Sequence, residues 1–500
     1  MIYYLCIFRN NDLKTIFFII IMKLLLIYPP RKYHMFGATL HSDAIDGEAG
    51  FYPPIGLLYI AAYLEEHSNC EIKVIDSFTE GLSHDQLKDR IMSENPDLVG
   101  IYISTFYLFD AILIARNTKS INKGIIVIAG GPHVNLYPIE SIAIPEVDIA
   151  VKGEGELVMN SIVKSIEKNR ANPEVGKIPG VLTKNNRNNF LTECKIPMLN
   201  ALPFPARHLL DHTKYRSILA KHNPITTVIS SRGCPYKCKF CSNLESGQRV
   251  RFRSAKSVVD ELRECVNKFG IYDYLFFDEL FTVNKERVID ICNEITSRGL
   301  KIRWHCRSRA DVLDEEMIIK MRKSGCRLIQ FGIETGSERL QKLVNKNLNL
   351  DKVEYVMKIA SDHGIYTYGN FMVGLPTETP DETISTIDFA KKLNLDYAIF
   401  GVFGPLAGSE FYDDGLREGK FKDFWKEFVN EPEVPIQDGS WTREDMAKYY
   451  AVISDAYRQF YLRPNYMLRR LFRTDSFSQM IWQIKSAYKI FDKLFKKFKK

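Results

Sequence analysis

The sequence predicts an α/β protein with two successive parallel-sheet domains and a helical C-terminal region. Over residues 22–160, short apolar segments rich in β-branched residues alternate with longer segments of helical periodicity, which is typical of a doubly wound parallel sheet. A second alternating series over residues 223–425 contains six strand–helix repeats and indicates a partial (βα)6, TIM-like barrel. Residues 426–500 have helical periodicity and no strand pattern.

Composition and charge narrow the class of protein. The chain has 500 residues with 45% apolar and 26% charged side chains, which favours a globular protein of two or three domains. The net charge is only +7, and seven lysines fall in the last sixteen residues, so we expect no nucleic-acid-binding surface. Three of the ten cysteines lie within eight residues, which in a reducing, cytoplasmic compartment indicates a metal site.

The first domain is predicted from its strands, which are Leu24–Ile27, Ile72–Ile75, Leu98–Ile103, Ile125–Ala129 and Asp148–Val151. Helical periodicity is clear over Gly56–Glu66 and Leu108–Thr118. Residues 1–21 are interpreted as an accessory extension or a mis-assigned start, with Met22 as the natural start. Ligands of doubly wound sheets lie outside the carboxyl ends of the strands, so residues there are the binding candidates.

The second domain follows a polar stretch, 161–222, that is predicted to be a linker with a small hairpin. Its six expected strands are Thr226–Ser230, Tyr274–Phe277, Ile302–His305, Leu328–Ile333, Thr367–Val373 and Tyr397–Phe403. Segments such as Ser257–Phe269, Asn284–Arg298 and Asp314–Lys323 are the expected helices between them. The chemistry of such barrels takes place at the C-terminal ends of the strands.

A cysteine-rich loop, SRGCPYKCKFCSN over residues 231–243, directly follows the first barrel strand. Its thiols Cys234, Cys238 and Cys241 have the spacing C-x3-C-x2-C and can bind three irons of a [4Fe-4S] cubane. The fourth iron then has no protein ligand, and a small molecule with an amine and a carboxylate can chelate it. A zinc site is the alternative, but it lacks a fourth ligand, because the nearest histidine, His222, lies twelve residues upstream of the first cysteine.

This loop, with Phe240 as the aromatic residue before the last cysteine, resembles the radical S-adenosylmethionine (SAM) superfamily. The resemblance implies reductive cleavage of SAM to a 5′-deoxyadenosyl radical, with an electron donor such as flavodoxin or ferredoxin. It also implies that polar residues at the ends of later strands bind SAM, and these are Asp278, Glu279, Arg309 and Glu334. Gly374–Glu378 resembles the turn on the adenine side. As simple structural alternatives, Asp278 or Glu279 caps a helix, and Gly332 and Gly374 are turn residues.

Residues 22–160 resemble the cobalamin-binding domain that precedes many radical SAM domains. The matching motifs are Tyr28–Pro30 and Tyr52–Tyr59, and the implied cofactor-binding residues are Ser104, Gly130, Gly131, Gly153 and Glu154. Lys32–Gly37 has lysine where the family's D-x-H-x-x-G motif has aspartate. Without that carboxylate nothing orients His34, so cobalamin is expected to bind without histidine coordination, with His133 packing nearby. A degenerate domain that binds nothing is the alternative.

The resemblance implies an enzyme that uses SAM and cobalamin to methylate an unactivated carbon of a small or lipid-like substrate. The runner-up is an oxidative cyclase similar to those of anaerobic tetrapyrrole biosynthesis, and a non-catalytic cobalamin or redox sensor is the remote alternative. A tRNA methylthiolation enzyme is disfavoured, because residues 22–200 contain only Cys70 and Cys194 and so lack a second cluster motif. The sequence does not indicate the catalytic residues that act on the substrate.

The C-terminal tail has an apolar stripe between Phe477 and Phe498 with lysines on both sides, which predicts a basic amphipathic helix. Two interpretations stay open. Residues 477–488 are expected to pack on the barrel, and residues 489–500 are expected to make peripheral contact with an anionic membrane surface.

Overall fold

The computed structural model describes residues 3–6, 17–33, 50–188, 196–217, 219–242, 249–428 and 443–473. The described residues form two compact units. The first contains those within 1–35, 54–211 and 424–436, and the second contains those within 36–53, 212–423 and 437–500. The predicted fold class is confirmed, because both units are α/β structures built on a six-stranded, mainly parallel sheet. No helix in the described parts combines the length and the apolarity needed to cross a membrane.

The sheet of the first unit has the strand order β4-β3-β5-β6-β7-β8. Its parallel strands are β3 (Lys23–Tyr28), β4 (Glu71–Asp76), β5 (Leu98–Tyr102), β6 (Ile126–Gly130) and β7 (Ile149–Val151). The short edge strand β8 (Val181–Thr183) is antiparallel to β7. The chain order reverses between β3 and β5, and doubly wound sheets bind their ligands at such a switch point.

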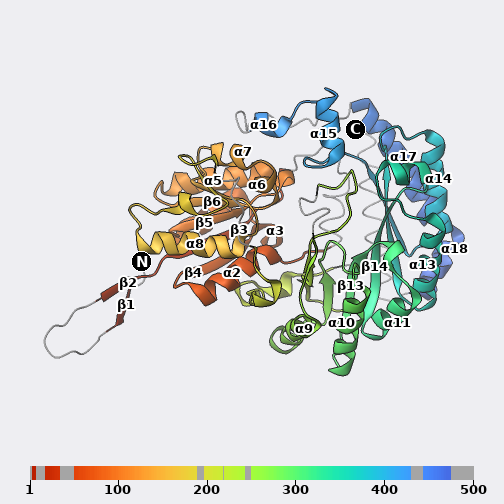
Figure 1. Ribbon diagram of the computed structural model, residues 1–500, viewed down its shortest axis with the longest axis horizontal. Helices are drawn as coiled ribbons and strands as arrows, with labels where there is room; N and C mark the ends of the chain where they lie inside the picture. The colour runs from red at the N-terminus through yellow and green to blue at the C-terminus, as the bar shows by residue number, and fades with distance from the viewer. Residues whose placement is uncertain are drawn as a thin grey trace. The chain divides into compact units, whose positions relative to one another are not determined.

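Helices cover both faces of this sheet (Figure 1). On one face α2 (Ile55–His67) packs against α8 (Gly155–Lys168), and on the other face α4 (His84–Glu94) packs against α5 (Leu108–Ile121). Because β3 is buried on both sides, its apolar run Leu24–Ile27 is continuous rather than alternating. The short helices of the unit are α3 (Ser77–Glu80), α6 (Pro132–Leu136), α7 (Pro138–Ala143) and α16 (Phe424–Phe428).

Two segments outside the predicted sheet domain contain secondary structure of their own. In the stretch 161–222, predicted to be a linker, α8 continues to Lys168 and β8 extends the sheet, and the first unit runs on to Asp211. The polar sequence does not reveal β8, because this strand has three residues and depends on pairing with β7. Within the predicted extension 1–21, β1 (Tyr3–Cys6) and β2 (Phe17–Ile20) form an antiparallel pair.

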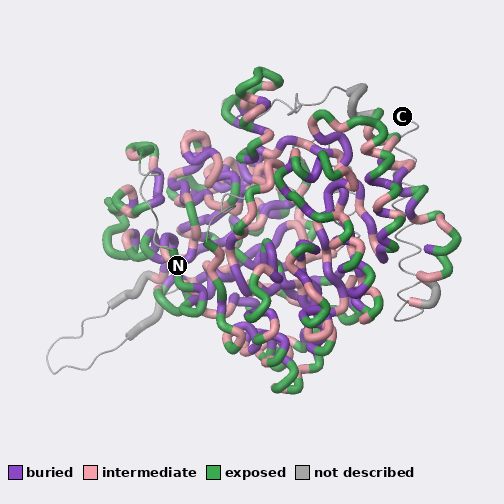
Figure 2. The backbone as a smooth tube through the Cα atoms, turned by 45° about the vertical axis from the view of Figure 1, so that its right-hand side comes forward, coloured by how far each residue is buried: buried purple, intermediate pink, exposed green. Residues whose placement is uncertain are grey.

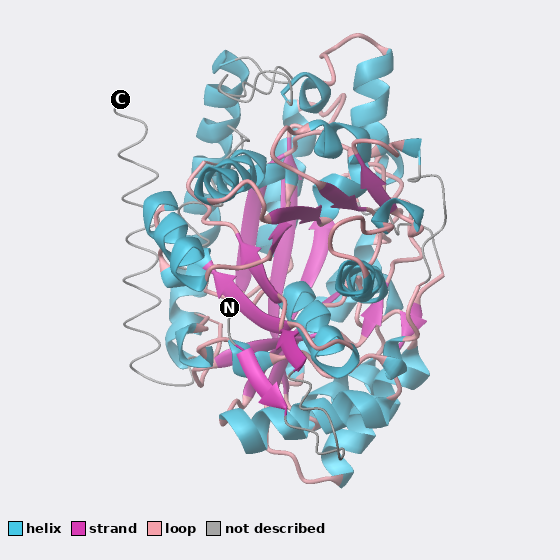
Figure 3. Ribbon diagram, turned by 90° about the vertical axis from the view of Figure 1, so that its left-hand side faces the viewer, coloured by secondary structure: helices cyan, strands magenta, loops and turns pink. Residues whose placement is uncertain are grey.

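The second unit contains an open sheet of six parallel strands in the order β16-β15-β14-β13-β12-β9, the predicted partial barrel (Figure 3). The strands are β9 (Ile225–Val228), β12 (Asp273–Phe276), β13 (Arg303–Ser308), β14 (Cys326–Glu334), β15 (Tyr366–Val373) and β16 (Tyr397–Val402). After β9, the short strand β10 (Ser231–Arg232) pairs with β11 (Arg251–Phe252). Each parallel strand therefore points its carboxyl end in the same direction.

Helices lie on one face of the barrel sheet. They are α9 (Ala255–Phe269), α10 (Lys285–Ser297), α11 (Glu315–Lys323), α13 (Leu350–Asp362), α14 (Pro380–Lys392), α17 (Arg443–Tyr461) and α18 (Pro464–Phe472). The short helices α12 (Glu338–Leu343) and α15 (Glu410–Arg417) pack instead in a separate apolar cluster with Phe240. The hydroxyls of Tyr457 and Tyr461 on α17 donate to backbone carbonyls of β16, which fixes this helix on the barrel edge. The two interpretations of residues 477–500 concern a segment outside the described residues.

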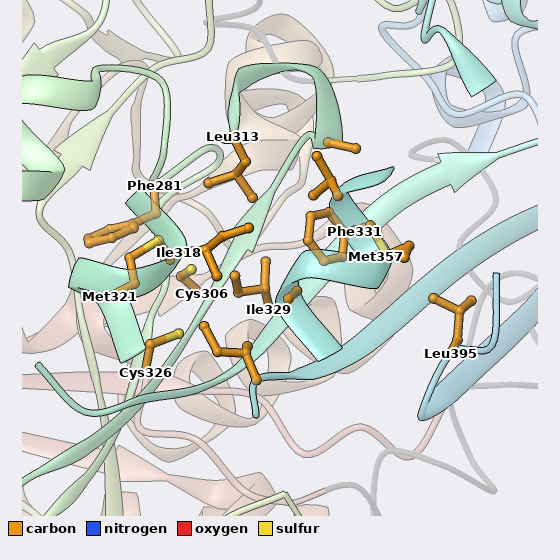
Figure 4. Packing of buried hydrophobic residues seen from close by; sticks show 14 of the residues in the cluster. Phe281, Cys306, Leu313, Ile318, Met321, Cys326, Ile329, Phe331, Met357 and Leu395 are labelled. Carbon is orange, nitrogen blue, oxygen red and sulfur yellow. The ribbon is translucent and has the colours of Figure 1, made fainter. Parts of the chain in front are cut away.

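The core of the second unit lies between the strands and these helices (Figures 2 and 4). Alternate strand residues point into it, among them Trp304, Phe331 and Phe371. The opposite face of the strands carries polar side chains instead, as expected for the interior of a barrel that holds ligands. Cys306 and Cys326 lie in the apolar core, where burial strongly raises the pKa of the Cys306 thiol.

Candidate functional site

The cysteine loop begins where β9 and β10 end, with Gly233 in a left-handed conformation (φ 101°). Cys234, Cys238 and Cys241 are each partly exposed. Five further cysteines are buried, and these are Cys70, Cys265, Cys292, Cys306 and Cys326. No group of His, Cys, Asp or Glu side chains among the described residues surrounds a single-ion site. A cubane has a different requirement, because each thiolate binds a different iron. The donor set fits that group.

Backbone contacts hold the middle of this loop. The amide of Lys239 donates to the carbonyl of Val344 (3.0 Å), and its own carbonyl accepts from the amide of Phe411 on α15 (3.1 Å). Two side chains add to these contacts: the side-chain amide of Asn345 donates to the carbonyl of Lys237 (2.8 Å), and the Lys239 ammonium pairs with Glu410 at 2.7 Å. The loop is therefore tied to the segments that follow β14 and β16, although its sequence neighbours lie at β9.

Asp278 and Glu279 both follow β12, but they have different surroundings. Asp278 is fully buried, and its carboxylate accepts from the Ser230 amide (2.7 Å), the Ser230 hydroxyl (2.6 Å) and the Ser231 hydroxyl (2.5 Å), with Arg287 at 3.4 Å. Glu279 is exposed and accepts from the Gly233 amide at 3.3 Å.

The surroundings of Asp278 show a structural role. Both of its oxygens accept hydrogen bonds behind the cysteine loop, so Asp278 positions this loop, and its predicted contact with SAM stays a prediction. Helix α10 is capped by Asn284, so neither acidic residue is the helix cap of the structural alternative.

Arg309 follows β13 and lies directly beside the cysteine loop. One guanidinium nitrogen is 4.0 Å from Sγ of Cys238, and the group lies 3.8 Å from the ring centre of Tyr236. It also donates to both carboxylate oxygens of Asp311 (2.9 and 2.7 Å) and to the carbonyl of Lys346 (2.7 Å). Burial alone would lower the pKa of Arg309, but Asp311 outweighs it and the pKa is raised. Arg309 thus brings a permanent positive charge to the thiols.

Glu334 ends β14 in a left-handed conformation (φ 70°), at a shift of the register between β14 and β15. Its carboxylate pairs with the ammonium of Lys346 at 2.6 Å, and both side chains are buried. A Cβ at Gly332 would collide with both groups, so this glycine makes room for the ion pair. Lys346 also lies 5.7 Å from the ring centre of Phe240, which packs on the apolar cluster around Leu340.

Lys346 is a site residue that the sequence did not indicate. It stands between Asn345 and Asn347, both of which have positive φ angles, and these asparagines indicate a tight turn at most. Burial raises the pKa of the Cys238 thiol, whereas Lys346 and Arg309 act in the opposite direction. Since a cluster binds thiolates, these two cations reduce the cost of deprotonating a partly buried cysteine.

The Gly374–Glu378 turn follows β15 and is closed by its own side chain. Gly374 has φ 87°, and Oε2 of Glu378 accepts from the amides of Gly374 (2.5 Å) and Leu375 (2.8 Å). Burial raises the pKa of Glu378. The structure therefore supports the turn role of Gly374, and it leaves the adenine-side role of the motif as a proposal.

In the first unit, the residues predicted to bind cobalamin lie at the carboxyl edge of the sheet. Gly131 has φ 115°, and a Cβ there would meet the carbonyl of Ile103 at 2.8 Å, so glycine is required by the backbone. No described atom lies within 4 Å of a Cβ placed on Gly130, which therefore faces open space. Ser104 precedes the turn after β5 and makes no side-chain cap to it.

Gly153 and Glu154 complete this edge between β7 and α8. Gly153 has φ 96°, and its amide donates to the side chain of Asn135 at 2.7 Å. Glu154 stands at the N-terminus of α8 without capping it through its side chain. The edge is thus formed mainly by backbone and small residues, which allow a flat ligand to approach closely.

Two histidines of this unit bear on the expected binding of cobalamin. His34 lies outside the described residues. His133 is fully buried, with its Nδ1 3.1 Å from the Thr105 hydroxyl and its ring against Tyr137 and Trp425. Burial lowers the pKa of His133 to about 3, so the imidazole is neutral.

Comparison with known proteins follows the same division of the chain. Residues 228–390 match the radical SAM superfamily, and residues 47–163 match the B12 binding domain. An uncharacterised methyltransferase of Pyrococcus horikoshii is 33% identical over 464 residues, which cover 91% of this chain and 96% of that protein. The anaerobic magnesium-protoporphyrin IX monomethyl ester cyclase of Rubrivivax gelatinosus is 28% identical over 79% of this chain and 70% of its own length.

Solved structures share the fold of about four fifths of this chain. The radical SAM methyltransferase TsrM of Kitasatospora setae, with cobalamin and a [4Fe-4S] cluster bound, has a TM-score of 0.66 at 18% identity and covers 80% of this chain and 78% of its own. The cobalamin-dependent radical SAM enzyme OxsB has a TM-score of 0.61 at 19% identity, over 81% of this chain and 56% of its own.

The fold and site define an enzyme that binds an iron–sulfur cluster in one α/β unit and a large cofactor at the sheet edge of another. The chain belongs to the cobalamin-binding radical SAM family. Its cofactors are a [4Fe-4S] cluster, SAM and cobalamin, and it has the architecture of the family's methyltransferases.

Proposed function

We propose that this enzyme methylates an unactivated carbon of a small or lipid-like substrate. The observation that carries the proposal is the match to a relative named as a methyltransferase along nearly the full length of both chains. When bound, the cluster supplies the electron that cleaves SAM, and cobalamin supplies the methyl group. The residues of the chain hold these groups, balance their charge and orient the substrate.

The roles of individual residues are part of this proposal. Cys234, Cys238 and Cys241 bind the cluster. SAM contacts two carboxylates, those of Glu279 and Glu334. Glu279 is exposed beside the loop, and Oε2 of Glu334 has no hydrogen-bond partner among the described residues. Phe240 shields one side of the cluster by packing on the barrel, and Arg309 supplies charge. Ser104, Gly130, Gly131, Gly153 and Glu154 form the edge against which cobalamin lies.

A second candidate is oxidative cyclisation, which is favoured by the match to the magnesium-protoporphyrin cyclase over 79% of this chain. The two functions use the same cofactors but leave different products. Methylation through cobalamin converts one SAM to S-adenosylhomocysteine and cleaves another to 5′-deoxyadenosine, whereas cyclisation driven by the radical requires only the second of these.

The test uses the anaerobically reconstituted enzyme with a chemical reductant and trideuteromethyl-SAM, with and without cobalamin. Methyl transfer predicts S-adenosylhomocysteine that forms only when cobalamin is present. A cell extract should then yield a product carrying the labelled methyl group. Formation of 5′-deoxyadenosine alone, with no cobalamin-dependent S-adenosylhomocysteine, contradicts methylation and favours the cyclase.

An electron donor and a site of action complete the proposal. A flavodoxin or ferredoxin is the donor that suits a low-potential cluster. The apolar stripe between Phe477 and Phe498, with lysines on both sides, suits peripheral contact with an anionic membrane, which would give access to a lipid-like substrate. Sedimentation with anionic vesicles at low and high salt tests the contact: binding should require residues 489–500 and weaken as salt rises. Unchanged binding without these residues contradicts it.

A further inference from the structure

Arg307 lies on the ligand-facing side of the barrel sheet. Trp304 and Cys306, at alternate positions of β13, point into the apolar core. Because successive side chains of a strand point to opposite faces, Arg307 points to the other face of the sheet. The strand register places it next to Gln330 on β14, and Gln330 next to Tyr368 on β15. A cation, an amide and a phenol therefore form one polar row across three strands.

The guanidinium of Arg307 has no fixed anionic partner. Among the described residues it makes no hydrogen bond and no ion pair, and its one direct contact is with the ring of Phe277, whose centre lies 4.5 Å away. Glu279 attracts it electrostatically without reaching ion-pair distance. Arg307 is half-buried, and this partial burial lowers the pKa of its guanidinium. A half-buried guanidinium without an anionic partner is free to bind an anionic ligand.

The surroundings of Arg307 are suited to a bound anion. Tyr52 and Tyr368 both interact electrostatically with the guanidinium, and burial raises the pKa of each phenol, so both stay protonated. The Tyr52 hydroxyl already donates to the Ser217 hydroxyl at 2.9 Å, so Tyr368 is the phenol that can donate to a bound anion. Phe277 is 40% exposed although it lies at the end of an inner strand, as a surface for a ligand would be. His305, two residues earlier on the same face, is buried with Nε2 unpaired among the described residues.

We propose that Arg307 binds an oxyanion, a carboxylate or a phosphonate, of the substrate, with Tyr52, Gln330 and Tyr368 around it. A planar guanidinium matches such groups through two parallel hydrogen bonds. This inference rests on the proposed function and narrows its substrate class to molecules with an anionic group. The carboxylate of SAM has the same chemistry, and the experiment separates the two sources.

The experiment measures binding of methylphosphonate to the cluster- and cobalamin-loaded enzyme by calorimetry, without reductant. Wild type, R307Q and R307K are compared with R327Q. Arg327 is a matched control, since it lies on the neighbouring strand but donates to the carbonyls of Arg322 and Cys326. We expect saturable binding by wild type, at least about tenfold weaker binding by R307Q, intermediate binding by R307K and no change in R327Q.

Each other outcome decides against part of the inference. No saturable binding by wild type, or equal binding by wild type and R307Q, overturns the oxyanion site. Repeating the titration with saturating SAM separates the sources: unchanged binding supports the substrate, and competition overturns that assignment in favour of the SAM carboxylate. If R307Q does not fold, R307K alone must still bind more weakly than R327Q. Because no turnover is measured, this result is independent of whether the enzyme methylates.

Discussion

Both units present the carboxyl ends of parallel strands, but they shape these ends in different ways. In the second unit, buried charges fix the site: the Asp278 network, the Glu334–Lys346 ion pair and the Arg309–Asp311 pair. In the first unit, the edge is formed by backbone, with glycines such as Gly131 in conformations that other residues rarely adopt. The difference matches the ligands, because thiolates need precise placement and balanced charge, whereas a macrocycle needs an open, flat approach.

The largest expected effect distinguishes two neighbouring acids. Asp278→Ala should destabilise the second unit by about 3–5 kcal/mol, because it removes the acceptor of a buried network and leaves Arg287 without its carboxylate. Glu279→Gln changes an exposed side chain and should leave stability nearly unchanged while weakening SAM binding. Denaturant unfolding and SAM titration of both variants provide the check. Equal stability of the two would mean that the buried network does not hold the loop.

The second effect concerns charge beside the thiols. Lys346→Met should lower the iron content of the reconstituted protein, since it removes a cation near Cys238 and leaves the buried Glu334 unpaired. Lys239→Met is the matched control, because Lys239 lies on the same loop but pairs with the half-exposed Glu410. Iron and sulfide analysis distinguishes them. Full iron occupancy in Lys346→Met would remove this lysine from the site.

A smaller effect separates two adjacent glycines in the first unit. Gly131→Ala should cost about 1–3 kcal/mol of stability, because of its φ of 115° and its contact with the Ile103 carbonyl. Gly130→Leu should fold normally, since space is open around it, and should bind cobalamin more weakly because the side chain occupies that space. Melting curves and cobalamin titration test the pair. Normal cobalamin binding by Gly130→Leu would place the cofactor elsewhere.

A further effect is a pH dependence shared by the units, which is small near neutral pH. Burial lowers the pKa of His133 to about 3 and that of His305 to about 4, well below the ordinary value near 6.5. The unfolded chain thus binds more protons between these values, so stability is full above pH 6.5 and falls as pH decreases, by up to about 1.4 kcal/mol per pH unit for each histidine. Replacing either histidine with glutamine should flatten the profile of melting temperature against pH. An unchanged slope would contradict this.

The sequence predicted the strands, the cysteine loop and the order of the units because these depend on local patterns. It did not predict Lys346, which lies in a loop and meets the strand-end Glu334 only through the fold. It did not predict the proposed role of Arg307, which depends on the register of β13, β14 and β15. The buried serine contacts of Asp278 were not predicted either, because a strand-end acid looks the same in sequence whether it faces a ligand or a buried serine pair. The three-residue strand β8 was missed because its pairing with β7, rather than its composition, makes it a strand.

The most direct test of the account measures iron, sulfide and 5′-deoxyadenosine in the anaerobically reconstituted variant with Cys234, Cys238 and Cys241 all replaced by alanine. We expect about four irons and four sulfides in wild type, and neither cluster nor SAM cleavage in the variant. Replacing the buried Cys306 and Cys326 instead should leave the cluster in place. A cubane signal that survives in the triple variant would contradict the central claim.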